Sequence, residues 1–147
     1  MRSRHLVVTG LLVVYSALLL VALFAPTSTE QSAMVTWLGA VMADLGLPGW
    51  LSNYQRLEVV MNAVIIAPVT FLGSMLRPSL GWRDWTAYGF AASLTVEAIQ
   101  LVLLPGRDGS FSDVVANTLG ALLGGLVFHV GRTLMGAVGR AQRRAEA

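Results

Sequence analysis

Glu97 places an ionisable group inside an otherwise apolar stretch of the sequence. A charge at the centre of a membrane-spanning helix costs about 2.5–3.5 kcal/mol, so such a residue is expected to face the interior of a helix bundle or a water-filled cavity. Ser93 lies four residues before Glu97 and Gln100 three residues after it, which places the three side chains on one helix face. The spacing predicts a buried polar face on which Glu97 acts as a general base or a hydrogen-bond acceptor.

Two neighbouring apolar stretches pair a carboxylate with an amide four residues later, as Glu58 with Asn62 and as Asp113 with Asn117. Arg107 lies in the short connection between the last two stretches, and its planar guanidinium can hold a carboxylate through two hydrogen bonds. The pattern predicts one polar site to which three helices contribute. Its candidate catalytic residues are Glu97, Arg107 and Asp113, and its candidate binding residues are Glu58, Asn62, Gln100 and Asn117.

A purely structural interpretation of these residues stays open. Asp113 and Glu58 can each cap the helix near whose start they lie, where a negative charge also suits the helix dipole. The three amides can join helices through hydrogen bonds, as amides commonly do in membrane bundles. Glu97 can form a buried ion pair with Arg107. A site is the preferred interpretation, because Glu97 lies deep and the polar residues gather at one end of the helices.

The composition is that of a membrane protein: 55 % of the 147 residues are hydrophobic and 12 % are charged, with a mean hydropathy of +0.67. A soluble domain carries about a quarter charged residues, so this chain is neither an ordinary soluble enzyme nor a disordered one. The lack of cysteine excludes disulfides, thiolate metal sites and a cysteine nucleophile. Four apolar runs are long enough to span a membrane, at residues 6–25, 57–76, 86–104 and 113–135. We predict an all-α integral membrane bundle of four transmembrane helices in one domain, residues 1–147, with a fraying cytoplasmic tail at 139–147.

The arginines set the expected orientation. On one side of a four-span topology lie Arg2, Arg4, Arg77, Arg83, Arg132, Arg140, Arg143 and Arg144. Only Arg56 and Arg107 lie on the other side. Because short cytoplasmic loops carry an excess of basic residues, both termini are expected in the cytoplasm and the polar site on the outer side. The basic residues flank apolar runs, so no nucleic-acid partner is predicted. His5 and His129 have no second ligand at metal-binding spacing, so no metal or cofactor is predicted.

The connection between the first two spans has the pattern of a further helix. Ser28-x-x-Gln31 has the form of a capping box, which begins a helix. Apolar residues then recur at helical spacing over 33–45, and a Pro-Gly pair at 48–49 ends the run. At about 16 residues this helix is too short to cross a membrane. We expect it either to lie in the outer interface as an amphipathic helix or to pack across the outer ends of the spans.

Ala116, Gly120 and Gly124 form a row of small residues at four-residue spacing in the last span. Small residues at this spacing let another helix approach closely. That helix can belong to the same bundle or to a second copy of the chain. A homo-oligomer therefore stays open as a partner, beside the membrane lipids.

The motifs at these positions resemble the VanZ-like family. They are Asn62 followed by Pro68 and Gly73, Glu97-x-x-Gln100, and Arg107 followed by Ser112-Asp113-x-x-x-Asn117-x-x-Gly120-x-x-x-Gly124. The resemblance covers residues 57–128, and its last stretch is the most specific part. It implies a small bacterial protein of four or five helices in the cell membrane. The namesake of the family is associated with low-level teicoplanin resistance, but the resemblance implies no particular reaction.

Two functions are compatible with the sequence. In the first, the outward-facing site binds or acts on a cell-envelope component, such as a cell-wall precursor, a lipid head group or a lipophilic glycopeptide, and thereby affects teicoplanin susceptibility. In the second, the protein is a non-catalytic scaffold or accessory subunit whose polar residues hold the helices together. A small transporter or channel is less favoured, because no polar stripe continues through the cytoplasmic half of the helices.

Overall fold

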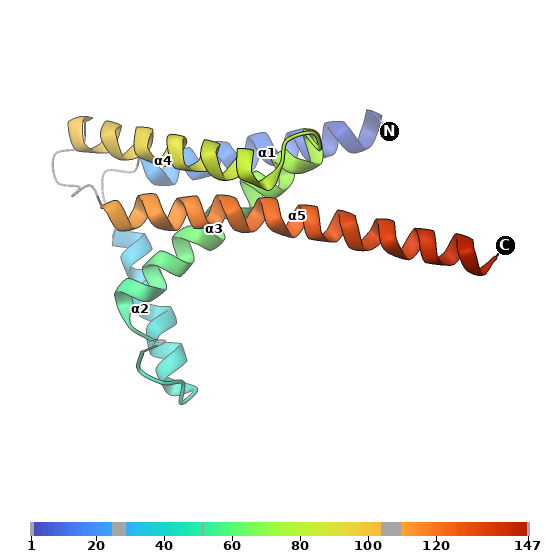
Figure 1. The fold of residues 1–147 in the computed structure, drawn as a ribbon. Helices are drawn as coiled ribbons and strands as arrows, with labels where there is room; N and C mark the ends of the chain where they lie inside the picture. The colour runs from blue at the N-terminus through green and yellow to red at the C-terminus, as the bar shows by residue number, and fades with distance from the viewer. Residues whose placement is uncertain (1, 25–28, 51, 104–109, 147) are drawn as a thin grey trace.

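The computed structural model describes residues 2–24, 29–50, 52–103 and 110–146, and this part of the chain contains helices and no strand. Its helices are α1 (Arg2–Leu23), α2 (Thr29–Asp44), α3 (Tyr54–Leu76), α4 (Trp82–Leu103) and α5 (Phe111–Ala145) (Figure 1). All except α2 are long and apolar enough to cross a membrane. The predicted all-α bundle of four spans, with a shorter helix between the first and second, is confirmed.

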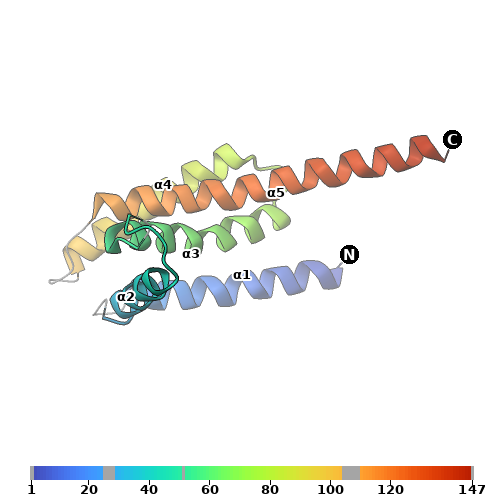
Figure 2. The ribbon, with the colours of Figure 1, turned by 90° about the horizontal axis from the view of Figure 1, so that it is seen from below.

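α5 is the central helix of the bundle. It packs along both α3 and α4, whereas α1 and α2 pack mainly on α3 (Figures 1 and 2). The last residues of α1 and α4 and the first residues of α3 and α5 lie together at one end, which we call the acidic end. The start of α1, the end of α3 and the start of α4 lie at the opposite end, which we call the basic end. This alternation brings the predicted polar residues of three helices to the acidic end.

The small residues of α5 allow its close contact with α3. A Cβ atom at Gly120 would overlap the carbonyl oxygen of Ala63, and one at Gly124 would overlap the carbonyl oxygen of Ala67 and the hydroxyl of Thr70. Neither backbone oxygen can move aside easily. The row therefore serves a contact within the bundle, which is one of the two arrangements that the sequence left open.

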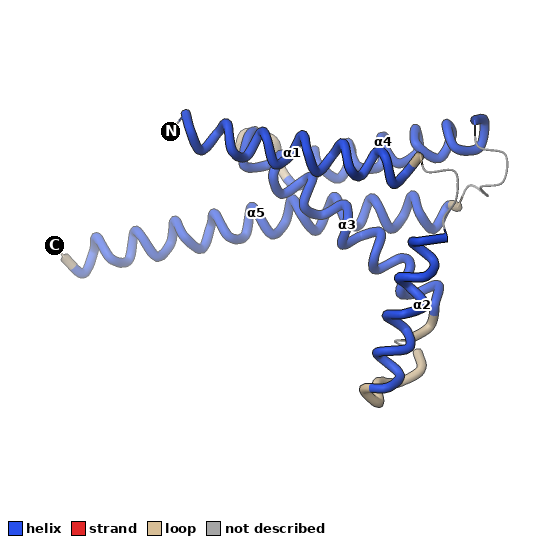
Figure 3. The backbone as a smooth tube through the Cα atoms, turned by 180° about the vertical axis from the view of Figure 1, so that it is seen from behind, coloured by secondary structure: helices blue, strands red, loops and turns tan. Residues whose placement is uncertain are grey.

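α2 lies crosswise at the acidic end, away from the direction of α4 and α5, as Figures 1 and 3 show from opposite sides. One side of the helix packs on α3, where a Cβ atom at Gly39 would lie 3.4 Å from the side chain of Leu57. Its other side leaves Met34 and Trp37 exposed. α2 thus has a packed face and an apolar outer face. Ser28 and the Gln31 side chain of the predicted capping box lie outside the described residues.

The last helix is longer than the sequence indicated. α5 continues to Ala145, so the described part of the tail that was expected to fray from residue 139 is helical in the structure. Arg143 and Arg144 lie in its last turn, where positive charge is favourable beside the unpaired carbonyl groups. At 35 residues the helix is about 52 Å long, against about 30 Å for a hydrocarbon core, so it projects past the bundle (Figure 2).

A hydrogen bond that the sequence did not indicate joins α1 to α3. The Tyr15 hydroxyl donates to the backbone carbonyl of Ile65 at 2.7 Å. This carbonyl lies three residues before Pro68, which lacks an N–H group and therefore interrupts the backbone hydrogen bonds of α3 at this level. A polar side chain from a neighbouring helix is a common way to satisfy the backbone around a proline in a membrane.

Candidate functional site

The buried face of α4 is polar and its exposed face is apolar. The residues of α4 that are buried are Ser93, Glu97 and Gln100, with 5 %, 9 % and 7 % of their surface exposed. Apolar side chains such as Leu94, Leu101 and Val102 point outward. In water this distribution would be unfavourable, but in a bilayer the apolar face meets lipid and the polar face meets other helices. The polar face predicted from the spacing of the three residues is confirmed.

Glu97 lies at the N-terminus of α5. One of its carboxylate oxygens accepts a hydrogen bond of 3.0 Å from the backbone N–H of Ser110, the N-cap residue of α5. The first turn of a helix has unpaired N–H groups and a partial positive charge, so it is a favourable place for a carboxylate. Sequence reasoning did not select Ser110, although a serine just before an apolar run is a typical N-cap signal.

Asp113 accepts a hydrogen bond from α3. The side-chain amide of Asn62 donates a hydrogen bond of 2.9 Å to Oδ1 of Asp113. The carboxylate of Glu58, one turn before Asn62, lies near enough to Asp113 for the two negative charges to interact. The helical spacing of Glu58 and Asn62 therefore brings both side chains towards the first turn of α5.

Neither Glu58 nor Asp113 is the N-cap of its helix. The N-cap of α3 is Asn53, whose side chain accepts a hydrogen bond of 3.4 Å from the backbone N–H of Arg56. Glu58 lies after the first turn of that helix, so the alternative in which it caps α3 is wrong. Asp113 lies in the first turn of α5, three residues after Ser110, where its charge does suit the helix dipole.

The remaining two amides connect helices. Asn117 of α5 donates to the hydroxyl of Ser93 in α4 at 3.1 Å. Gln100 of α4 donates to the backbone carbonyl of Leu23 at 2.7 Å, at the last turn of α1. The bond from Gln100 satisfies one of the carbonyl groups that the end of a helix leaves without a donor in the same helix. Both amides therefore have a structural role, whatever else they bind.

Six of the seven predicted site residues lie at the acidic end, and Arg107 lies outside the described residues. The structure brings three of them together as carboxylates around the first turn of α5: Glu58, Glu97 and Asp113, which we call the acidic cluster. Among the described residues, no three His, Asp or Glu side chains are grouped so that they could hold a metal ion. The chemistry that this arrangement offers is hydrogen-bond acceptance and proton transfer.

Two further buried hydroxyls lie in α3 towards the basic end, and sequence reasoning missed both. Thr70 and Ser74 are buried, and Ser74 is fully enclosed. Each donates to a carbonyl of its own helix, Ala67 and Thr70 respectively, at 3.2 and 2.7 Å. Because these hydroxyls are satisfied within the helix, they do not extend the polar face of the acidic end along the bundle.

Comparison of the sequence with protein families supports the resemblance in its motifs. A family model described as VanZ/LLP1 matches residues 11–132 of the chain. The chain belongs to the VanZ-like family. The match begins within α1 and ends in α5, so it reaches all four spans and includes all seven predicted site residues. Searches of curated proteins and of solved structures gave no match. Membership of the VanZ-like family thus establishes the kind of membrane protein without assigning it a reaction.

Proposed function

We propose that the acidic cluster is an outward-facing site that binds or acts on a cell-envelope component. In this proposal the carboxylates accept hydrogen bonds from hydroxyl or amino groups of the ligand, and Glu97 is the base if a reaction takes place. Arg107 enters the proposal from the sequence alone, as the cation that binds an anionic group of the ligand.

One observation carries the proposal: Asn62 of α3 holds the Asp113 carboxylate of α5 through a hydrogen bond of 2.9 Å, and Glu58, one turn before Asn62, adds a second carboxylate near Asp113. Two like charges close together at one end of a bundle oppose folding, and helices that needed only to be joined could use the amide bonds alone. Ionisable groups that persist inside membrane bundles commonly serve binding or proton transfer.

The orientation of the site belongs to the same proposal. The excess of arginine at the basic end favours a cytoplasmic position for both termini, so that the acidic cluster and α2 face outward. A bacterial cell membrane is the location that the VanZ-like family suggests.

Teicoplanin susceptibility tests the proposal in cells. A sensitive Gram-positive host would express the protein or one of three variants, Glu97→Gln, Arg107→Ala and Glu146→Gln, at matched membrane abundance. Glu97→Gln keeps an oxygen that can accept the bond from Ser110, so it removes the charge with little change in packing. Glu146 is a carboxylate outside the cluster, beyond the last helix, and serves as the control.

The intact protein and Glu146→Gln are expected to protect the host against teicoplanin. Glu97→Gln and Arg107→Ala are expected to lose this protection. Equal protection by all four proteins would remove the cluster from the function. A host that is no better protected by the intact protein than by an empty vector would contradict the glycopeptide part of the proposal.

A scaffold function is the second candidate, and the amide bonds favour it. Asn62, Gln100 and Asn117 each hydrogen-bond another helix, which is what a structural network requires. In a scaffold, Glu97→Gln would lower the melting temperature and the membrane abundance together. Loss of protection at unchanged abundance and melting temperature would contradict this second function.

A further inference from the structure

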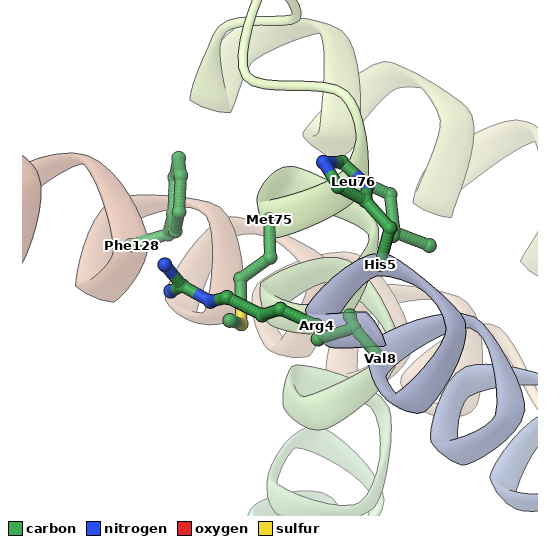
Figure 4. A pocket seen from close by; sticks show the side chains of 6 residues that line it. All are labelled: Arg4, His5, Val8, Met75, Leu76 and Phe128. Carbon is green, nitrogen blue, oxygen red and sulfur yellow. The ribbon is translucent and has the colours of Figure 1, made fainter. Parts of the chain in front are cut away.

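A small pocket opens at the basic end, at the opposite side of the bundle from the acidic cluster. It lies between the start of α1, the end of α3 and the middle of α5, and it has a volume of about 220 Å³. Its lining residues are Arg4, His5, Val8, Met75, Leu76 and Phe128. In Figure 4 the side chain of Arg4 extends across the pocket towards Phe128, while His5 lies beside Leu76.

The pocket combines a cationic edge with an apolar floor. Arg4 and His5 belong to the first turn of α1, where unpaired backbone N–H groups add partial positive charge. Val8, Met75 and Phe128 supply the apolar surface. Within the described residues Arg4 forms no ion pair, although its guanidinium is exposed and able to bind two oxygens of an anion.

The surrounding charge favours an anionic occupant. By position in the chain, eight of the ten arginines belong to the basic end, while of the eight acidic residues only Asp84 and Glu146 do. Asp84 is engaged with the backbone N–H of Gly81 at the start of α4, at 2.7 Å. The charge at this end of the molecule is therefore mainly positive, in contrast to the acidic end.

The size and the position of the pocket indicate that its anionic occupant is the head group of a lipid. Pockets that enclose a drug-sized molecule have volumes of about 300–1,000 Å³, so this one is large enough for a head group only. The neighbouring face of α1 is apolar and exposed, with Val7 and Leu11 pointing outward. Acyl chains of a molecule held by its head group could run along this face.

We infer that the pocket formed by Arg4, His5, the apolar end of α3 and Phe128 in the middle of α5 binds the phosphate head group of an anionic phospholipid. Basic pockets between transmembrane helices are known sites for anionic head groups. The guanidinium of Arg4 contacts the phosphate, and Val8 and Phe128 contact the first carbons of the acyl chains. This site is separate from the acidic cluster, so either can fail without the other.

The test compares melting temperatures of the full chain in nanodiscs of phosphatidylcholine alone and of phosphatidylcholine mixed with phosphatidylglycerol. The variants are Arg4→Ala, Arg4→Lys and, as a charge-matched control, Arg144→Ala. Arg144 lies in the last turn of α5, outside the pocket. A parallel measurement with added inorganic phosphate in phosphatidylcholine nanodiscs separates a lipid from a soluble anion.

Phosphatidylglycerol is expected to raise the melting temperature of the unchanged protein and of Arg144→Ala. Arg4→Ala should lose more than half of this gain, and Arg4→Lys should keep most of it. In phosphatidylcholine alone, the unchanged protein and all variants should have equal melting temperatures. Three results would overturn the inference. The first is an equal rise in melting temperature in all proteins, and the second is a loss of this rise in Arg144→Ala as large as that in Arg4→Ala. The third is a rise caused by inorganic phosphate as large as that caused by the lipid.

Discussion

The amide of Asn62 donates a hydrogen bond of 2.9 Å to the carboxylate of Asp113, and this bond joins α3 to the first turn of α5. The bond fixes one carboxylate beside another, because Glu58 lies one turn before Asn62 on the same helix. Residues that are 51 positions apart in the sequence thereby create a negatively charged group at one end of the bundle. The second carboxylate near Asp113, that of Glu58, distinguishes this end from an ordinary set of interhelical hydrogen bonds.

Removal of the charge at Glu58 should stabilise the fold. Glu58→Gln keeps the size of the side chain and eliminates both the partial desolvation of a charge and its repulsion from Asp113. Because Glu58 is only partly buried, the melting temperature of this variant in detergent should rise only slightly, by about 1–2 °C. Glu146→Gln, outside the bundle, should leave the melting temperature unchanged. A lower melting temperature for Glu58→Gln would mean that this carboxylate contributes to folding, and it would favour the scaffold function.

A methyl group at Gly124 should destabilise the bundle. Gly124→Ala places a Cβ atom against the carbonyl of Ala67, which belongs to the backbone of α3, and overpacking of this kind costs about 1–3 kcal/mol. Gly131→Ala in the same helix is the control, because nothing lies within 4 Å of its added Cβ atom. Thermal melting in detergent measures the difference, and equal melting temperatures for the two variants would refute this α3–α5 contact.

The bond from Gln100 should hold the end of α1. Gln100→Leu leaves the Leu23 carbonyl without this donor, so backbone amides in the last turn of α1 should exchange faster with deuterium. The start of α1, at the opposite end of the helix, should keep its rate. Thr95→Val is a suitable control, since the Thr95 hydroxyl is exposed and donates to the Ala91 carbonyl of its own helix. Unchanged exchange in the last turn of α1 would show that packing on α3 alone holds it.

The orientation can be tested with single cysteines, because the chain has none of its own. Asp44→Cys lies at the end of α2 and Ser79→Cys lies in the turn between α3 and α4, at opposite ends of the bundle. A maleimide that cannot cross membranes should label only Asp44→Cys in intact cells and both variants after lysis. Labelling of Ser79→Cys alone in intact cells would reverse the proposed orientation and place the acidic cluster in the cytoplasm.

The sequence was sufficient to predict the four spans and the polar face of α4. Apolar runs of this length fold as helices in a membrane because every backbone polar group must be paired, and few other structures achieve that pairing. The positions of Ser93, Glu97 and Gln100 follow from helical spacing, since a polar residue in such a run has only the bundle interior in which to find partners. The spacing of residues in the sequence and the apolar surroundings of the bilayer together determine the spans and the polar face of α4.

Other contacts depend on which helices become neighbours, and local pattern does not specify that. The bond from Tyr15 to Ile65 requires α1 to lie beside α3, and nothing near Tyr15 in the sequence indicates this. The partner of Gln100 is a backbone carbonyl 77 residues away. The N-cap of α3 is a different case, because an asparagine just before a helix is a local signal: the cap is Asn53 and not Glu58, the candidate taken from the sequence.

Ligand binding to the purified protein tests the central proposal most directly. The protein, Glu58→Gln and Glu146→Gln would each be placed in nanodiscs and titrated with a fluorescently labelled cell-wall precursor lipid, and melting temperatures would be measured on the same samples. The proposal predicts that the protein and Glu146→Gln bind the labelled lipid equally. Glu58→Gln should bind it at least about tenfold more weakly, which corresponds to about 1.4 kcal/mol. The melting temperature of Glu58→Gln should be no lower than that of the unchanged protein. Equal binding by all three proteins, or no binding by the unchanged protein, would contradict the assignment of this site to a cell-wall precursor.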